Sequence, residues 1–183
     1  MIRHAFLALA ALALAACGQQ TTTTETAETM PPETNMSAQP AMSDAEFVQT
    51  VANSDAFEIQ SSQLAAERAA RQQVKDFAAM MVRDHTQTSQ QLTALAPTLN
   101  ITAPAPQLDA TMQGRLDSLR TQSGEAFDDA YLDAQVAAHE QAIRTFEAYV
   151  AGSQTPQLRD WANTTLPKLR EHLQTVQSLE NAT

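Results

Sequence analysis

Residues 74–95 constrain the fold more than any other stretch, because their apolar side chains recur with helical spacing. Positions that alternate steps of three and four residues share one face of an α-helix. The members of this face are Val74, Phe77, Met81, His85, Thr88, Leu92 and Leu95. A histidine therefore stands in the middle of a stripe that predicts a buried helix face.

Three other predicted helices carry a polar residue at a matching place in their apolar stripe. These residues are Glu58 on an earlier helix and His139 and His172 on two later ones. At about 1.5 Å of rise per residue, each lies about 18–26 Å from the hairpin turn of its own helix pair. We therefore expect the four to meet near mid-length of a helical bundle.

The folded part begins at Ser43 and spans 43–183, about 140 residues, which is one domain's worth. Glycine is scarce and no run alternates with the period of a strand, so we predict an all-α fold. Helices are predicted over residues 44–69, 71–97, 108–121, 125–152 and 156–179. Ser43 and Glu46 form a capping box at the first of them. A ferritin-like four-helix bundle, with a long crossover that contains the short helix 108–121, accommodates this pattern.

The N-terminal residues read as an export signal with a lipid anchor. Residues 1–16 combine a basic start with an apolar run that is too short to span a bilayer. Leu14-Ala15-Ala16-Cys17 resembles the lipobox of bacterial lipoproteins, in which the cysteine is acylated. The alternative is a cleaved signal followed by a chance cysteine. Cys17 is the only cysteine, so an internal disulfide is excluded.

Residues 17–42 connect this anchor to the folded domain. Thr, Glu and Pro dominate them and large apolar side chains are almost absent, so we predict a disordered tether. Gly18 after Cys17 resembles lipoproteins that travel on to the outer membrane. We expect the protein in the cell envelope, facing the periplasm and attached to the membrane through the lipid.

The charge balance excludes one class of partner. The chain has 11 Lys+Arg and 21 Asp+Glu, and cleavage before Cys17 removes one arginine, which leaves a net charge of −11. Nucleic acid binding needs a basic face, so nucleic acid is not expected as a partner. A protein partner cannot be named from the sequence.

Four motifs in order resemble the DUF4142 family of bacterial exported proteins. They are Glu58, the stretch Val74-Lys-Asp-Phe-Ala-Ala-Met-Met-Val-Arg-Asp-His85, Phe127-Asp-Asp-Ala-Tyr131 followed by His139, and Leu166-Pro-Lys-Leu-Arg-Glu-His172-Leu. The resemblance covers nearly everything from Ser43 to Leu179. It implies a ferritin-like helical fold and an exported protein. The family has no established activity, so the resemblance implies no mechanism.

The convergent residues allow two interpretations. Glu58, His85, His139 and His172 could hold one transition-metal ion, for which three imidazoles and a carboxylate suit zinc, iron or copper. Alternatively, they form a buried hydrogen-bond network that satisfies its own members. A di-iron centre is not expected, because no Glu-x-x-His unit stands on the candidate helices.

Further polar residues could orient these histidines as hydrogen-bond partners. The candidates are Asp84, Asp128, Asp129, Tyr131 and Glu171. The alternative is that the four carboxylates are solvated helix charges and the tyrosine a core aromatic.

The sequence contains no visible apparatus for nucleophilic or nucleotide chemistry. Ser-His-Asp, Cys-His and glycine-rich phosphate patterns are absent. The sequence therefore favours a lipid-anchored envelope protein whose bundle binds or interacts rather than catalyses. The alternative is a metal-binding protein or a metal-dependent oxidoreductase built on the Glu/His cluster.

Overall fold

The computed structural model describes residues 42–102 and 105–182, and these fold into α-helices. The elements are α1 (Asp44–Arg68), α2 (Gln72–Leu95), the short 3-10 helix η1 (Ala96–Leu99), α3 (Ala110–Thr121), α4 (Gly124–Gly152) and α5 (Pro156–Glu180). The all-α prediction is confirmed, and the helix bounds agree with the predicted ones within two residues. The described residues do not include the predicted signal peptide, residues 1–16, or residues 17–41 of the predicted tether with Cys17.

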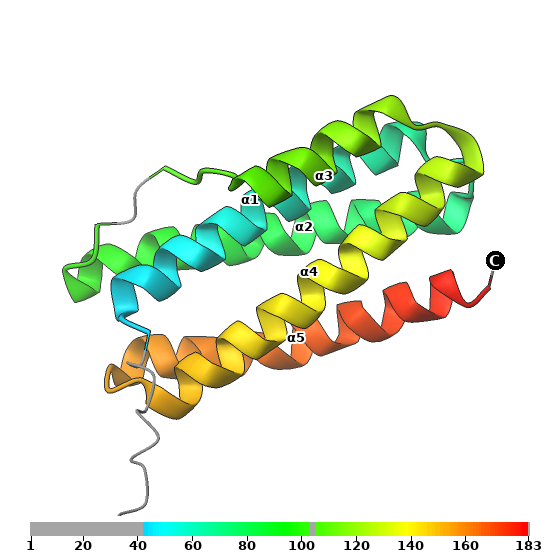
Figure 1. Cartoon of the computed structure of the whole chain (residues 1–183). Coiled ribbons are helices and arrows are strands. Elements are labelled where there is room, and N and C mark those ends of the chain that lie inside the picture. The colour runs from blue at the N-terminus through cyan, green and yellow to red at the C-terminus, as the bar shows by residue number, and fades with distance from the viewer. Residues whose placement is uncertain (1–41, 103–104, 183) are drawn as a thin grey trace, which may run out of the picture. The chain divides into compact units, whose positions relative to one another are not determined.

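The four long helices pack side by side. Within the described domain, α1 packs on α2 and α4 on α5, while α1 also contacts α4 and α2 contacts α5 (Figure 1). The short α3 lies against α1 and α4. None of the helices in the described ranges is long and apolar enough to cross a membrane. The ferritin-like assignment itself stays a prediction.

The connection from α2 to α4 runs back along the length of the helices. Ala69, just after α1, pairs with Gly124 at the start of α4. Arg71 Nη1 donates to the carbonyl oxygen of Leu179 near the end of α5. The end of α1 and the start of α4 thus lie at the same end, whereas α2 leads away from it. The stretch with η1 and α3 carries the chain back, as the crossover prediction requires.

Local hydrogen bonds set the helix ends. Ser43 and Glu46 form the predicted capping box, with Glu46 Oε2 accepting from the Ser43 amide at 2.9 Å. The buried Asp128 accepts from the amides of Ala70 and Arg71 at 2.8 and 2.9 Å. This carboxylate therefore fixes the turn between α1 and α2 from the side of α4.

A layer of buried polar side chains separates two apolar clusters. One cluster lies around Phe47, Tyr149 and Leu158, and the other around Phe77, Phe127 and Tyr131. We call the residues between them the polar layer, and it consists of Asp55, Glu58, Ser61, Ser62, His85, Gln135, His139 and His172. Burying such groups is unfavourable unless they find partners. The partners of the polar layer therefore decide what it does.

Candidate metal centre

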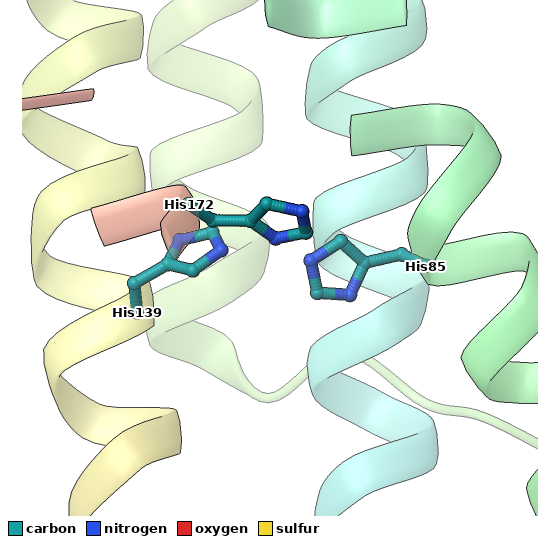
Figure 2. Close-up of side chains that lie close together, drawn as sticks. All are labelled: His85, His139 and His172. Carbon is teal, nitrogen blue, oxygen red and sulfur yellow. The ribbon is translucent and has the colours of Figure 1, made fainter. Parts of the chain in front are cut away.

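Three histidines from three helices meet in the polar layer. His85 comes from α2, His139 from α4 and His172 from α5, and Figure 2 shows their rings facing one another. The ring centroids are 5.4–5.6 Å apart. Each side chain is at most 4% exposed. The apolar stripe of each helix has thus brought its one imidazole to the same depth and height.

Carboxylates on neighbouring helices hold two of the rings. His85 Nδ1 lies 2.7 Å from Asp55 Oδ1 on α1, and His172 Nε2 lies 3.0 Å from Asp84 Oδ2 on α2. An ionised carboxylate only accepts hydrogen bonds, so each of these ring nitrogens carries a proton. Burial raises the pKa of Asp84, but hydrogen bonds from Arg83 and His172 outweigh it, so the pKa is lowered overall.

A main-chain carbonyl holds the third ring. His139 Nδ1 lies 2.9 Å from the carbonyl oxygen of Gln135, one helical turn earlier on α4. A carbonyl oxygen cannot donate, so Nδ1 must carry the proton and Nε2 keeps its lone pair. The three rings therefore have defined orientations and tautomers, as in sites where a protein acceptor orients a ligating histidine.

The remaining nitrogen of each ring has no protein partner. These buried atoms are His85 Nε2, His139 Nε2 and His172 Nδ1. One ligand atom from each ring can be chosen so that the three lie within 4.8 Å of one another. Among the described residues, this group of possible metal ligands consists of the three histidines and includes no carboxylate. The three rings thus stand close together, and each keeps one buried nitrogen without a hydrogen-bond partner among the described residues.

The electrostatic setting favours neutral imidazoles at two positions. Burial lowers the pKa of His139 to about 3, and charge on His85 acts in the same direction. Burial also lowers the pKa of His172, although the hydrogen bond to Asp84 opposes it. Burial lowers the pKa of His85 too, but Asp55 and Glu58 outweigh burial and raise it overall. The pKa of His85 is thus shifted in the opposite direction to those of the other two histidines.

Glu58 lies beside this group rather than within it. Its Oε1 is 3.7 Å from His139 Nδ1, the nitrogen that Gln135 already holds, and its Oε2 has no hydrogen-bond partner. Burial raises the pKa of Glu58 to about 7, and the charge of His85 offsets this only in part. The predicted cluster of four is thus three converging histidines with a buried carboxyl group next to them.

Of the predicted orienting residues, Asp84 alone contacts a histidine ring. The Asp129 side chain is 60% exposed and lies 3.9 Å from Arg71 Nη2, and Glu171 pairs with Lys168 at 2.7 Å on the surface. These two positions correct the prediction, because each side chain points away from the polar layer. Asp128 caps the turn after α1 instead.

Tyr131 borders the polar layer, and its hydroxyl bonds a serine rather than a histidine. Its hydroxyl lies 2.8 Å from Ser62 Oγ, one turn beyond Glu58 on α1. Burial raises the pKa of Tyr131 well above its usual value. The hydroxyl therefore stays protonated and satisfies the serine on the far side of Glu58.

Asp55 is the site residue that the sequence analysis missed. Its Oδ1 holds His85 and its Oδ2 accepts from Ser89 Oγ at 3.0 Å, so both oxygens bind residues of α2. It stands three residues before Glu58, and this spacing places both carboxyl groups on one face of α1. The three-residue spacing from Glu58 is the sequence signal that could have identified Asp55.

One hollow beside the layer is lined by none of the three histidines. It measures about 380 Å³, lies between α1, α3 and α4, and is lined by Phe57 and Ala138 among others. These two residues directly precede Glu58 and His139 in the chain. Within the described residues, this hollow therefore does not reach the three histidines.

The geometry fits a metal ion bound by nitrogen. A tetrahedral ion with bonds of about 2.0–2.1 Å holds its nitrogen ligands about 3.3 Å apart. The ligand atoms lie within 4.8 Å of one another, so they would have to move closer together to hold such an ion. The donors are neutral or deprotonatable imidazoles, which suit zinc, copper, iron and nickel.

The sequence model of the family DUF4142, a domain of unknown function, matches residues 29–179. The chain belongs to the DUF4142 family. No curated protein sequence matches this DUF4142 chain.

Solved structures resemble the DUF4142 chain in fold. A DUF305 fragment from Deinococcus radiodurans superimposes with a TM-score of 0.68 at 15% identity, covering 80% of this chain and 99% of that one. CopM in the Cu(I)-bound form gives 0.64 at 16% identity, covering 76% and 96%. A Streptomyces coelicolor DUF305 protein, provisionally classed as secreted, gives 0.64 at 12% identity, covering 76% and 93%. At these identities the likeness establishes the fold alone.

Proposed function

We propose that the DUF4142 chain binds one transition-metal ion through His85 Nε2, His139 Nε2 and His172 Nδ1. Two observations carry this proposal: the three buried rings offer ligand atoms within 4.8 Å of one another, and each ring keeps one nitrogen without a partner. The opposite nitrogen of each ring donates to a protein acceptor. Such a donor and acceptor arrangement leaves a lone pair for a metal on every ring.

A purely structural network explains the same residues less well. Buried polar atoms in folded proteins are nearly always paired, and an unpaired one costs about 1–3 kcal/mol. Five buried side-chain atoms of the polar layer have no partner within the described part of the protein: His85 Nε2, His139 Nε2, His172 Nδ1, Glu58 Oε2 and Gln135 Oε1. A bound ion would satisfy the three nitrogens together.

Holding the metal suits this site better than catalysis on a substrate. The three rings are buried, and none of them lines the hollow between α1, α3 and α4. CopM, which shares the fold, has been solved with Cu(I) and with Cu(II), so this helical arrangement is compatible with a metal-binding protein. A metal-dependent oxidoreductase would require a path for a second reactant to the ion.

Elemental analysis of protein purified without a histidine tag tests the proposal. We expect about one zinc or copper ion per chain after metal loading and removal of excess. His139→Ala should lose most of this metal because it removes one of three nitrogen ligands. Asp129→Asn, which changes an exposed carboxylate on the same helix, should retain it. Equal metal content in wild type and His139→Ala would contradict the site.

We also propose that a lipid on Cys17 anchors the protein in the cell envelope, in the outer membrane and facing the periplasm. A separate proposal is that the helices follow a ferritin-like topology. The lipobox resemblance and Gly18 support the location. The return of the chain along the helices through α3 supports the topology. Cell fractionation tests the anchor: Cys17→Ala should leave the membrane fraction, and a variant as membrane-bound as wild type would contradict it.

A further inference from the structure

Two buried carboxyl groups lie next to the three histidines without a basic residue to neutralise them. Asp55 and Glu58 are 3% and 1% exposed. Asp55 Oδ1 bonds the His85 ring, and Glu58 Oε1 lies 3.7 Å from the His139 ring. Across the described ranges, the buried residues include no lysine or arginine. A bound cation is therefore the partner that would balance both carboxylates.

The other charged groups around the histidines already have partners. Asp84 pairs with Arg83 at 2.7 Å on the outer side. Glu171 pairs with Lys168 on the surface, and the buried Asp128 pairs with Arg71 at the turn after α1. The two carboxylates on α1 are thus the acidic groups of the polar layer that have histidines but no Lys or Arg beside them.

Given the proposed metal site, we propose that Asp55 and Glu58 make it selective for a divalent cation over Cu(I). Three neutral imidazoles bring no charge to the ion. A divalent ion cancels the two carboxylate charges, whereas Cu(I) leaves one negative charge buried. Uncompensated buried charge is strongly unfavourable, so the protein favours the divalent state.

Glu58 has the stronger direct role of the two. Its Oε2 is buried without a hydrogen bond of ordinary length, although Gln135 stabilises the charged form of the carboxyl group. A bound ion would take this oxygen as a donor beside the three nitrogens. Carboxylate oxygen is a harder ligand than imidazole and binds Zn(II) or Cu(II) in preference to Cu(I). Asp55 acts through His85, whose ring it orients and makes more basic. It is a positioning residue, not a ligand.

Competitive titration of the purified full-length protein against chelators, with Zn(II) and separately with Cu(I), tests the inference. Glu58→Gln keeps the shape of the side chain and removes its charge. We expect it to weaken Zn(II) binding about 10- to 100-fold, while Cu(I) affinity changes by less than about threefold. Asp55→Asn should shift the ratio of the two affinities in the same direction. Glu171→Gln removes one exposed carboxylate next to His172 and should leave both affinities unchanged.

The outcomes separate this inference from the proposed function. If wild type binds neither ion, both the metal site and the selectivity are wrong. If wild type binds one ion per chain but Glu58→Gln and Asp55→Asn keep its Zn(II)-to-Cu(I) affinity ratio, the site stands and the inference is overturned. Circular dichroism of each variant shows whether it remains folded. If Glu58→Gln does not fold, the ratio measured with Asp55→Asn decides.

Discussion

Replacing Glu58 with glutamine in the metal-free protein distinguishes a buried acid from a buried ion pair. Glu58 is 1% exposed, and burial raises its pKa from 4.5 to about 7. This is a difference of about 2.5 pKa units, and each unit corresponds to about 1.4 kcal/mol. Above neutral pH, the ionised carboxylate therefore destabilises the folded state by up to about 3 kcal/mol relative to a neutral side chain of the same shape.

Proton binding determines the sign of the effect. Below pH 4.5 the carboxyl group is protonated in both the folded and the unfolded chain, so it makes no difference between wild type and Glu58→Gln. As the pH rises from about 4.5 to about 7, the wild type loses stability because the folded state holds a proton that the unfolded state has released, and above about 7 the loss is complete. Removing Glu58 also removes a charge that raises the pKa of His85. The destabilisation of about 3 kcal/mol is therefore an upper limit.

Urea unfolding followed by circular dichroism, with a chelator present, measures the effect. We expect equal stability of the two proteins at about pH 4.5, and a gain of up to about 3 kcal/mol for Glu58→Gln at about pH 8. Glu171→Gln, an exposed change of the same kind, should show no difference at either pH. A Glu58→Gln protein less stable than wild type at about pH 8 would refute the reasoning, because it would show that the carboxylate has a cationic partner.

Three further predictions concern the pH dependence of the site and the local structure. Metal should be released on acidification, because protons compete for the imidazoles and the pKa of His85 lies above its usual value. Equilibrium dialysis from about pH 8 to 5 should show that the loss of bound metal begins above about pH 6.5. Asp128→Ala leaves two turn amides and Arg71 without their buried acceptor and should cost about 3 kcal/mol in urea unfolding. Ser43→Ala removes the capping box and should cost about 1 kcal/mol in thermal unfolding, whereas Thr111→Ala, inside α3, should cost less.

The period of the apolar stripes made the convergence of the histidines predictable. His85 interrupts a stripe whose neighbours Phe77, Met81 and Leu92 are all buried, and a residue on that line must face the core. The constant rise per residue then places His139 and His172 at the same height as His85. The histidine site was therefore accessible from the sequence because it depends on helix geometry alone.

The partners of the histidines were harder to predict, because they depend on side-chain direction between helices. Neighbouring helical residues point about 100° apart, so the sequence could not decide which of Asp128 and Asp129 faces inward. The structure buries the first at the turn after α1 and exposes the second. Asp55 lies on the shoulder of its stripe, where a carboxylate is more often solvated.

The carbonyl that orients His139 could not be found by inspecting residue types. The acceptor is the main-chain oxygen of Gln135, and every residue has such an oxygen. The position of Glu58 beside the histidines, rather than among their ligand atoms, likewise depends on rotamers that the sequence does not encode in a simple pattern.

Anomalous scattering from a crystal of the metal-loaded protein tests the central claim most directly. Data collected on either side of the absorption edge of the bound metal locate the ion independently of the protein atoms. The account predicts one peak per chain, about 2.0–2.1 Å from His85 Nε2, His139 Nε2 and His172 Nδ1. A peak elsewhere on the protein, or ordered water alone between the three rings of metal-loaded protein, would contradict it.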